Sequence, residues 1–207
     1  MAKNHAVSQS DFILQAATKG DLTALKNIND LSQELIEQSM LISAEKGYFK
    51  IFKYLAEKAD KERTEWTDYQ EISAREGHVN IFAYLNEYKK DYVYDDWGSF
   101  MEDAIIRGDF EMVKFLDRGN MDEYVVLAID HRRHDIAKYA LEHGNIRFMD
   151  WEEPMVAALE QKYLDLAEII TGQFDDINWK DVYAEIEGYC SDVVAAYIKN
   201  KIKLNVE

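Results

Sequence analysis

Proline is almost absent from this sequence: Pro154 is the one proline in 207 residues. Because proline interrupts helices and is common in turns, its scarcity favours an all-helical chain over a sandwich or barrel. Glycine is also sparse, with nine residues. The single cysteine, Cys190, excludes an intramolecular disulfide, so the chain does not require an oxidising compartment.

Long apolar runs and an excess of basic residues are missing as well. No stretch approaches the roughly 18 apolar residues that span a membrane, and the first residues lack the pattern of a secretory signal. We therefore expect no membrane partner and a cytoplasmic location, in the producing cell or in a host cell. With 24 basic and 40 acidic side chains the formal charge is −16, which argues against direct nucleic-acid binding.

Sequence motifs of catalysis and metal binding are lacking too. There is no glycine-rich phosphate loop, no His-Glu-x-x-His, no Gly-x-Ser-x-Gly and no cysteine pair. His131 and His134 can share a helix face, but no third ligand is evident, so we expect a basic surface turn there. We predict that the protein is not an enzyme and has no catalytic residues, metal site or cofactor.

An internal repeat is the main positive signal. The strong copies share a pair of small residues, two polar residues, a glycine, any residue and an apolar residue; the copy at 104–110 departs from this pattern at Ile105 and Ile106. These copies are 16–22, 43–49, 73–79 and 104–110. Apolar residues follow Gly47, Gly77 and Gly108 after four, five, seven and eight positions, which is one face of a helix. In the third copy they are Ile81, Phe82, Tyr84 and Leu85.

Three weaker copies have another residue at the glycine position, which we call the anchor. They are identified by the same apolar positions, such as Leu166, Ala167 and Ile170. The predicted anchors are Gly20, Gly47, Gly77, Gly108, Arg132, Lys162 and Cys190. The chain is thus predicted to consist of seven helix pairs in one domain, 1–207, because short helices need stacked neighbours to bury their apolar faces.

The helix starts are predicted nine residues before each anchor. Asp11, Asp68 and Asp181 occupy this position as expected N-caps, and Ser99 with Glu102 matches a capping box. Pro154 falls one residue later in its repeat, at the expected first helical position. Each inner helix should therefore have about eight residues, followed by the turn, an outer helix and a linker.

These motifs resemble the ankyrin-repeat family. The most similar copy is residues 73–85, and Leu116-Asp117-Arg118-Gly119 resembles the end of a family repeat. The resemblance implies an all-α solenoid that binds proteins, and a structural role for His78. This sequence departs from the family in its shorter repeats and in lacking the Thr-Pro-Leu-His opening, which puts the projecting hairpin fingers in doubt.

The four tryptophans share one position, eleven residues before an anchor, and acidic residues surround three of them. Tryptophan and tyrosine dominate binding hot spots, so the sequence favours an acidic, aromatic ledge on the linker edge. Packing against the first helical turn is the alternative. The predicted partner-binding residues are Trp66, Tyr92, Tyr94, Asp95, Asp96, Trp97, Asp150, Trp151, Glu152, Asp175, Asp176 and Trp179.

The functional hypothesis is a protein-interaction module with an acidic surface. Its expected partner is a protein with a basic surface. The chain would block that surface, as an inhibitor, an immunity-type protein or a host-targeting protein. The first alternative is a nucleic-acid mimic that occupies a DNA- or RNA-binding enzyme, which requires basic residues to lie on the opposite side. The second alternative is an enzyme with a nonstandard site, which requires a deep pocket with converging polar groups.

Overall fold

A computed structural model describes residues 8–89, 91–92, 96–145, 150–175 and 177–204. These residues form helices and no strands, so the described linkers contain no β-hairpin fingers. The chain divides into two compact units, an N-terminal unit of residues 1–100 and a C-terminal unit of residues 101–207. No helix in the described ranges is long and apolar enough to cross a membrane.

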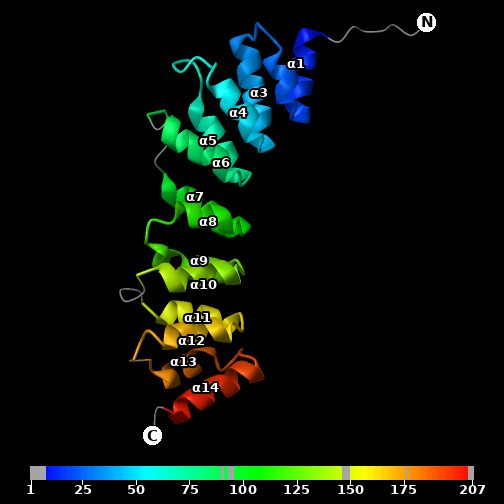
Figure 1. Ribbon diagram of the computed structural model, residues 1–207. Coiled ribbons are helices and arrows are strands. Elements are labelled where there is room, and N and C mark those ends of the chain that lie inside the picture. Colours follow the sequence, from blue (N-terminus) through cyan, green and yellow to red (C-terminus); the bar gives the residue numbers. More distant parts are fainter. Residues whose placement is uncertain (1–7, 90, 93–95, 146–149, 176, 205–207) are drawn as a thin grey trace, which may run out of the picture. The chain divides into compact units, whose positions relative to one another are not determined.

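Within each unit the helices form successive antiparallel pairs (Figure 1). The inner helices are α1 (Gln9–Lys19), α3 (Gln33–Glu45), α5 (Trp66–Arg75), α7 (Trp97–Arg107), α9 (Val125–Asp130), α11 (Glu152–Glu160) and α13 (Trp179–Ile186). The outer helices are α2 (Leu22–Lys26), α4 (Phe49–Ala56), α6 (Val79–Tyr88), α8 (Phe110–Leu116), α10 (His134–His143), α12 (Leu164–Thr171) and α14 (Asp192–Leu204). A short 3₁₀ helix, η1 (Met121–Tyr124), precedes α9.

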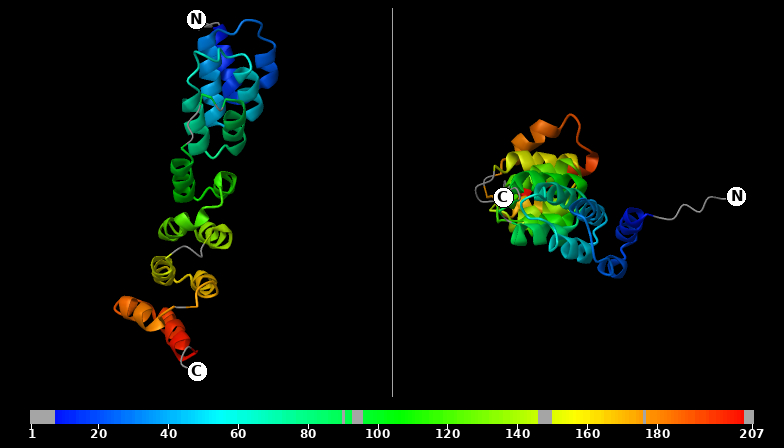
Figure 2. Two further views of the ribbon diagram at one scale, coloured as in Figure 1. Left: turned by 90° about the vertical axis from the view of Figure 1, so that its left-hand side faces the viewer. Right: turned by 90° about the horizontal axis from the view of Figure 1, so that it is seen from above.

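Stacking of like helices builds the core of each unit. In the C-terminal unit α9 packs on α11 and α11 on α13, while α10 packs on α12, so the inner and outer helices form two layers (Figure 2). The predicted apolar positions after the anchors are buried, for example Ile136 and Ala137 in α10. Each fully buried Ile, Leu or Phe contributes about 2 kcal/mol relative to an exposed one, which short helices need for stability.

The turns confirm the predicted repeat register. The anchor residue has a left-handed φ, which is 75° at Gly77. The anchors Arg132 and Lys162, predicted although they are not glycines, also have left-handed φ values of 57° and 64°. In these turns the amide after the anchor donates to a carbonyl five residues earlier, as His78 does to Ser73 over 2.8 Å. This is the Schellman motif, which closes a helix end on its own carbonyls.

The seventh turn differs in detail. Cys190 is not left-handed, and its amide donates to the carbonyl of Ile186 over 2.9 Å. Nevertheless α14 begins two residues after Cys190, as each of the other outer helices begins two residues after its anchor. The predicted register therefore extends to all seven helix pairs, while the turn geometry is shared by the first six.

The predicted N-cap positions were wrong. In α1 the cap is Ser8, and Asp11 lies in the first turn, where the two residues form a capping box. The α13 cap is Asn178, three residues before Asp181. A carboxylate is favourable at both the cap and the first turn, so the acidic pattern did not distinguish these positions.

Two further details of the helix starts differ from the prediction. Ser99 lies inside α7 and is not a cap; its amide donates to Asp96 Oδ1 over 3.2 Å. Pro154 is the third residue of α11 and not the first. Proline is tolerated there because the first-turn amides have no acceptor within the helix.

Candidate functional site

The four tryptophans all lie at the starts of inner helices, but they differ in exposure. Trp66 and Trp179 begin α5 and α13 and are buried, with 1% and 3% of their surface exposed. Trp97 and Trp151 are half-buried. Packing thus accounts for two of the four indoles, and these two offer almost no surface to a partner.

Trp66 is tied into the N-terminal unit on two sides. Its indole Nε1 donates to the carbonyl of Lys61 over 3.0 Å. The Lys89 ammonium lies 3.7 Å from the centre of one of its rings and 4.7 Å from that of Tyr88. Lys89 is 1% exposed, and its Nζ has no hydrogen-bond partner among the described residues. Burial, with a smaller effect of Lys61, lowers the pKa of Lys89 to about 8.

The predicted acidic residues form three clusters, around Trp97, Trp151 and Trp179 in that order. The first of these has local partners within its own unit. The Tyr92 hydroxyl donates to Glu62 Oε1 over 2.8 Å, and this hydrogen bond is the main cause of the raised pKa of Tyr92. Asp96 caps the start of α7 through the amide of Ser99. Tyr94 and Asp95, which belong to the same predicted cluster, lie outside the described residues.

The second acidic cluster opens into a hollow of about 380 Å³ on the inner helices of the C-terminal unit. Its carboxylates come from α9, α11, α13 and the residue before Trp151: they are Asp130, Asp150, Glu152, Glu153, Glu160 and Glu185. Val126, Val156 and Ala157 supply the apolar lining, and no basic side chain lines it. All six carboxylates are exposed. We call this feature the acidic hollow.

Of the six carboxylates in the acidic hollow, two were predicted from the sequence as binding residues and four were not. Asp150 and Glu152 were predicted, and Asp150 Oδ1 accepts the amide of Glu152 over 3.0 Å. Asp130 and Glu160 both lie two residues before an anchor, so stacking of α9 on α11 brings them to one surface. Their shared register position is the sequence signal that could have identified them.

The third acidic cluster lies apart from this lining. Asp175 is exposed and does not line the hollow, and Asp176 lies outside the described residues. The neighbouring Asp181 accepts a hydrogen bond from Asn178 Nδ2 over 2.6 Å at the start of α13. This cluster therefore combines one exposed carboxylate with a local helix cap.

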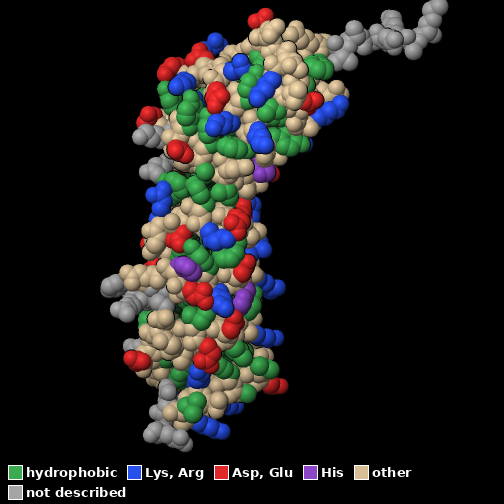
Figure 3. Space-filling view, viewed as in Figure 1, with side chains coloured by type: hydrophobic (Ala, Val, Ile, Leu, Met, Phe, Trp, Pro, Cys, Tyr) green, Lys and Arg blue, Asp and Glu red, His purple; other side chains and the backbone are tan. Residues whose placement is uncertain are grey.

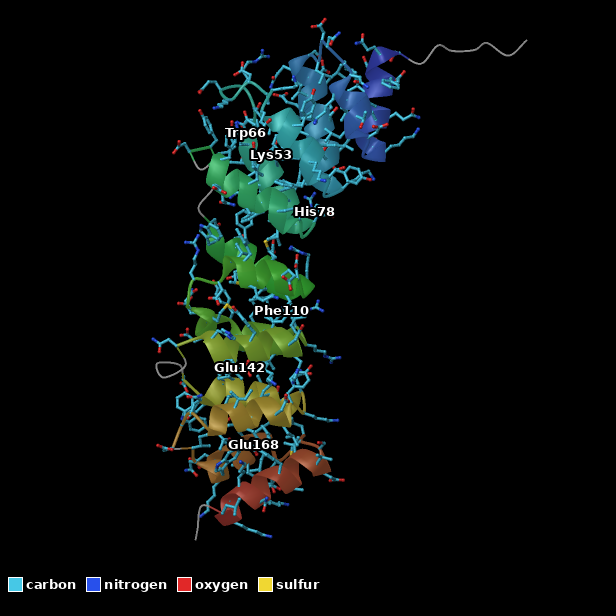
Figure 4. The ribbon with its side chains drawn as sticks, in the orientation of Figure 1. Lys53, Trp66, His78, Phe110, Glu142 and Glu168 are labelled. Atoms are coloured by element: carbon cyan, nitrogen blue, oxygen red, sulfur yellow. The ribbon has the colours of Figure 1, made fainter. Side chains whose placement is uncertain are left out.

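Charge is unevenly distributed between the two helix layers of the C-terminal unit. In α9, α11 and α13 the one basic residue is Lys180. The outer helices combine acidic residues with Lys114, Lys138, Lys199, Lys201 and Lys203. The face that carries Glu142 and Glu168 accordingly shows acidic and basic side chains interspersed (Figures 3 and 4). The uncompensated negative charge of these helices thus lies on the inner layer.

Three basic side chains at the turns, His78, Arg133 and His134, make contacts between repeats. His78 Nε2 lies 3.1 Å from the carbonyl oxygen of Glu45 in the preceding repeat, and Arg133 Nε donates to the carbonyl of Ile106 over 3.1 Å (Figure 4). His134 Nε2 lies 3.0 Å from Asp165 Oδ1 in the next repeat. Partial burial opposes ionisation of Asp165, but the hydrogen bond and charge of His134 lower its pKa below the usual range. The basic segment 131–134 is thus a turn with inter-repeat contacts.

Metal-binding geometry is not found in the described part of the chain. No group of three or more His, Cys, Asp or Glu side chains there is arranged to hold a metal ion. Cys190 is a free, half-buried thiol beside the seventh turn.

Comparison with known proteins gives a fold-level likeness. No family model matches the sequence, and no curated protein matches it. The crystal structure of the human ASB11 ankyrin repeat domain superimposes with a TM-score of 0.51 at 19% identity, covering 80% of this chain and 85% of that chain. Together with the repeated helix pairs and Schellman turns, this likeness shows that the chain has the fold of an ankyrin-repeat solenoid.

Proposed function

We propose that the chain is a non-catalytic protein-binding module that captures a basic surface of another protein through its inner helices. The acidic hollow carries this proposal, because it gathers six carboxylates with no basic side chain among its lining residues. A concave site lined by one sign of charge focuses its field and raises the local concentration of oppositely charged groups. Its apolar patches can contact the stem of a lysine or arginine while the carboxylates bind the cationic end.

The biological role that fits this chemistry is that of a blocker. An inhibitor, immunity-type or host-targeting protein would cover a basic surface that the partner needs for its own activity. The likeness to an ankyrin repeat domain supports binding in general, and the chemistry of the partner comes from the hollow alone. Among the other predicted binding residues, Asp175 is exposed in the same unit as the hollow, whereas Tyr92, Asp96 and Trp97 belong to the N-terminal unit and would contact a partner separately.

The test is a pull-down with paired variants. Asp130→Asn with Glu160→Gln removes two charges from the hollow, whereas Asp135→Asn with Glu142→Gln removes two exposed charges from α10. We expect one basic partner to be captured by the wild type and the α10 variant. The hollow variant should bind this purified partner about tenfold more weakly, because interfacial charge pairs are worth one or more kcal/mol. Equal binding by both variants would rule out the hollow as the site.

A nucleic-acid mimic is a second candidate. It is favoured by the placement of Lys114, Lys138 and the α14 lysines on outer helices, away from the acidic inner layer of the same unit. Its partner would be a DNA- or RNA-binding enzyme, and an oligonucleotide would then displace the chain from the captured protein. A partner that binds oligonucleotide and this chain simultaneously would exclude the mimic.

A further inference from the structure

A second hollow, of about 470 Å³, lies on the turn edge of the N-terminal unit and differs chemically from the acidic one. It is formed where the first two turns meet the starts of α2, α4 and α6. The side chains that give it its chemistry are Lys19, Leu22, Tyr48, Phe49, Lys50 and Asn80. None of them belongs to the predicted partner-binding set. We call this feature the lysine hollow.

The floor of the lysine hollow is apolar and closely packed. Ile51 is buried, and Leu22, Tyr48 and Phe49 are half-buried. A Cβ atom added to Gly20 would lie 3.3 Å from the ring of Tyr48, so this ring packs closely on the first turn. Phe49 packs edge-to-face on Tyr84, with ring centres 6.0 Å apart. An apolar side chain in this hollow of about 470 Å³ would cover the half-buried rings and leucine of the floor, and burial of such apolar surface is favourable.

The rim of the lysine hollow carries unused positive charge. Lys19 and Lys50 are exposed, and neither has a recorded hydrogen bond or ion pair among the described residues. No acidic side chain lines the hollow, although the chain as a whole has a formal charge of −16. Lys26 and Lys53 continue the basic character along α2 and α4, each with its ammonium near a tyrosine ring. Figure 3 shows basic side chains interspersed with hydrophobic ones over this unit.

We propose that the lysine hollow binds a partner-protein segment in which an apolar side chain lies beside aspartate or glutamate. The apolar side chain occupies the floor, and the neighbouring carboxylates pair with Lys19 and Lys50. Charge complementarity favours this occupant. Its acidic flank would lie beside the two unpaired ammonium groups of the rim, and no carboxylate lines the hollow to repel it. The site lies in the N-terminal unit, so this proposal stands or falls independently of the acidic hollow.

The test uses an array of short synthetic peptides with two adjacent central residues drawn from Leu, Ile, Phe and Met. The flanks are all glutamate, all serine or all lysine. We expect the full-length chain to bind some glutamate-flanked peptides and to discriminate against the serine- and lysine-flanked versions. Lys19→Glu with Lys50→Glu should weaken that binding about tenfold or more. Lys138→Glu with Lys180→Glu, which makes the same charge change in the C-terminal unit, should leave it unchanged.

Two further measurements keep the result interpretable. Circular dichroism establishes that both variants are folded, and Lys19→Gln with Lys50→Gln should give an intermediate loss, since it removes charge without reversing it. The proposal is overturned if no glutamate-flanked peptide binds better than its serine-flanked version, or if both charge-reversal variants lose binding equally. Preference for a single-stranded oligonucleotide over every peptide would also overturn it.

Discussion

The ammonium of Lys89 lies 3.7 Å from the centre of one ring of Trp66, and both side chains are 1% exposed. The interaction is a cation–π contact that replaces hydration of a buried charge only in part, because Lys89 Nζ has no hydrogen-bond partner among the described residues. Because the ammonium is buried, this pair makes the stability of the chain depend on pH.

Lys89→Met should stabilise the protein at neutral pH. Methionine preserves most of the apolar contact and removes a buried charge without hydrogen bonds, so we expect the free energy of unfolding to rise by about 1 kcal/mol at pH 7. Urea titration followed by circular dichroism measures the difference. A marked loss of stability would mean that the contact with Trp66 outweighs the desolvation of the ammonium.

The same pair predicts the sign of a pH effect. The pKa of Lys89 is about 8 in the folded chain, below its ordinary value of 10.5. Between these values the unfolded chain binds more protons, so this group makes the wild type more stable as pH rises through about 8. The advantage of Lys89→Met should therefore be smaller at about pH 9.5 than at pH 7. A constant difference would show that Lys89 titrates normally.

Glycine should stabilise two of the degenerate turns. Arg132 and Lys162 have φ values of 57° and 64°, a region that costs a residue with a side chain about 1 kcal/mol. We expect Arg132→Gly and Lys162→Gly each to raise the free energy of unfolding by about 0.5–1 kcal/mol. Cys190→Gly is the control, because Cys190 has no left-handed φ to relieve and should gain nothing. Thermal or urea unfolding of the three variants decides the matter.

Gly47 should be far less tolerant of substitution than Gly119. Both have positive φ, 69° and 85°, so alanine is strained at either position. A Cβ on Gly47 would also lie 2.6 Å from the imidazole of His78, whereas nothing lies within 4 Å of one on Gly119. We expect Gly119→Ala to cost about 1 kcal/mol and Gly47→Ala clearly more. Equal losses would mean that His78 moves aside freely.

We expect residues 1–207 to unfold as one domain, and the buried tryptophans allow a test. Variants that retain only Trp66 or only Trp179 report on the N-terminal and C-terminal units respectively. In each variant the urea midpoint from fluorescence should match the midpoint from circular dichroism, because nearest-neighbour stacking couples successive repeats. Separated midpoints would show that the two compact units unfold independently.

The repeat register was predictable because it depends on local features. The turn at Lys162 was identified from the apolar residues that follow it, Leu166, Ala167, Ile169 and Ile170, since a helical face is visible in a single stretch of sequence. The helix starts were less predictable, because Asp11 suits the cap and the first turn equally well. The acidic hollow was predictable only in part: Asp150 and Glu152 lie next to a tryptophan in sequence, whereas Asp130 and Glu160 come from different repeats and meet through stacking of α9 on α11.

The turn contacts have a consequence for how freely this surface can change. His78 and Arg133 reach the backbone carbonyls of Glu45 and Ile106, each two residues before an anchor. A carbonyl acceptor is indifferent to the side chain it belongs to, which explains why glutamate and isoleucine serve equally at this position. Asp130 and Glu160, at the equivalent position of other repeats, direct their side chains to the acidic hollow. At Glu45 and Ile106 the contact between repeats is thus made by the backbone, so a change of side chain at this position should leave the contact in place.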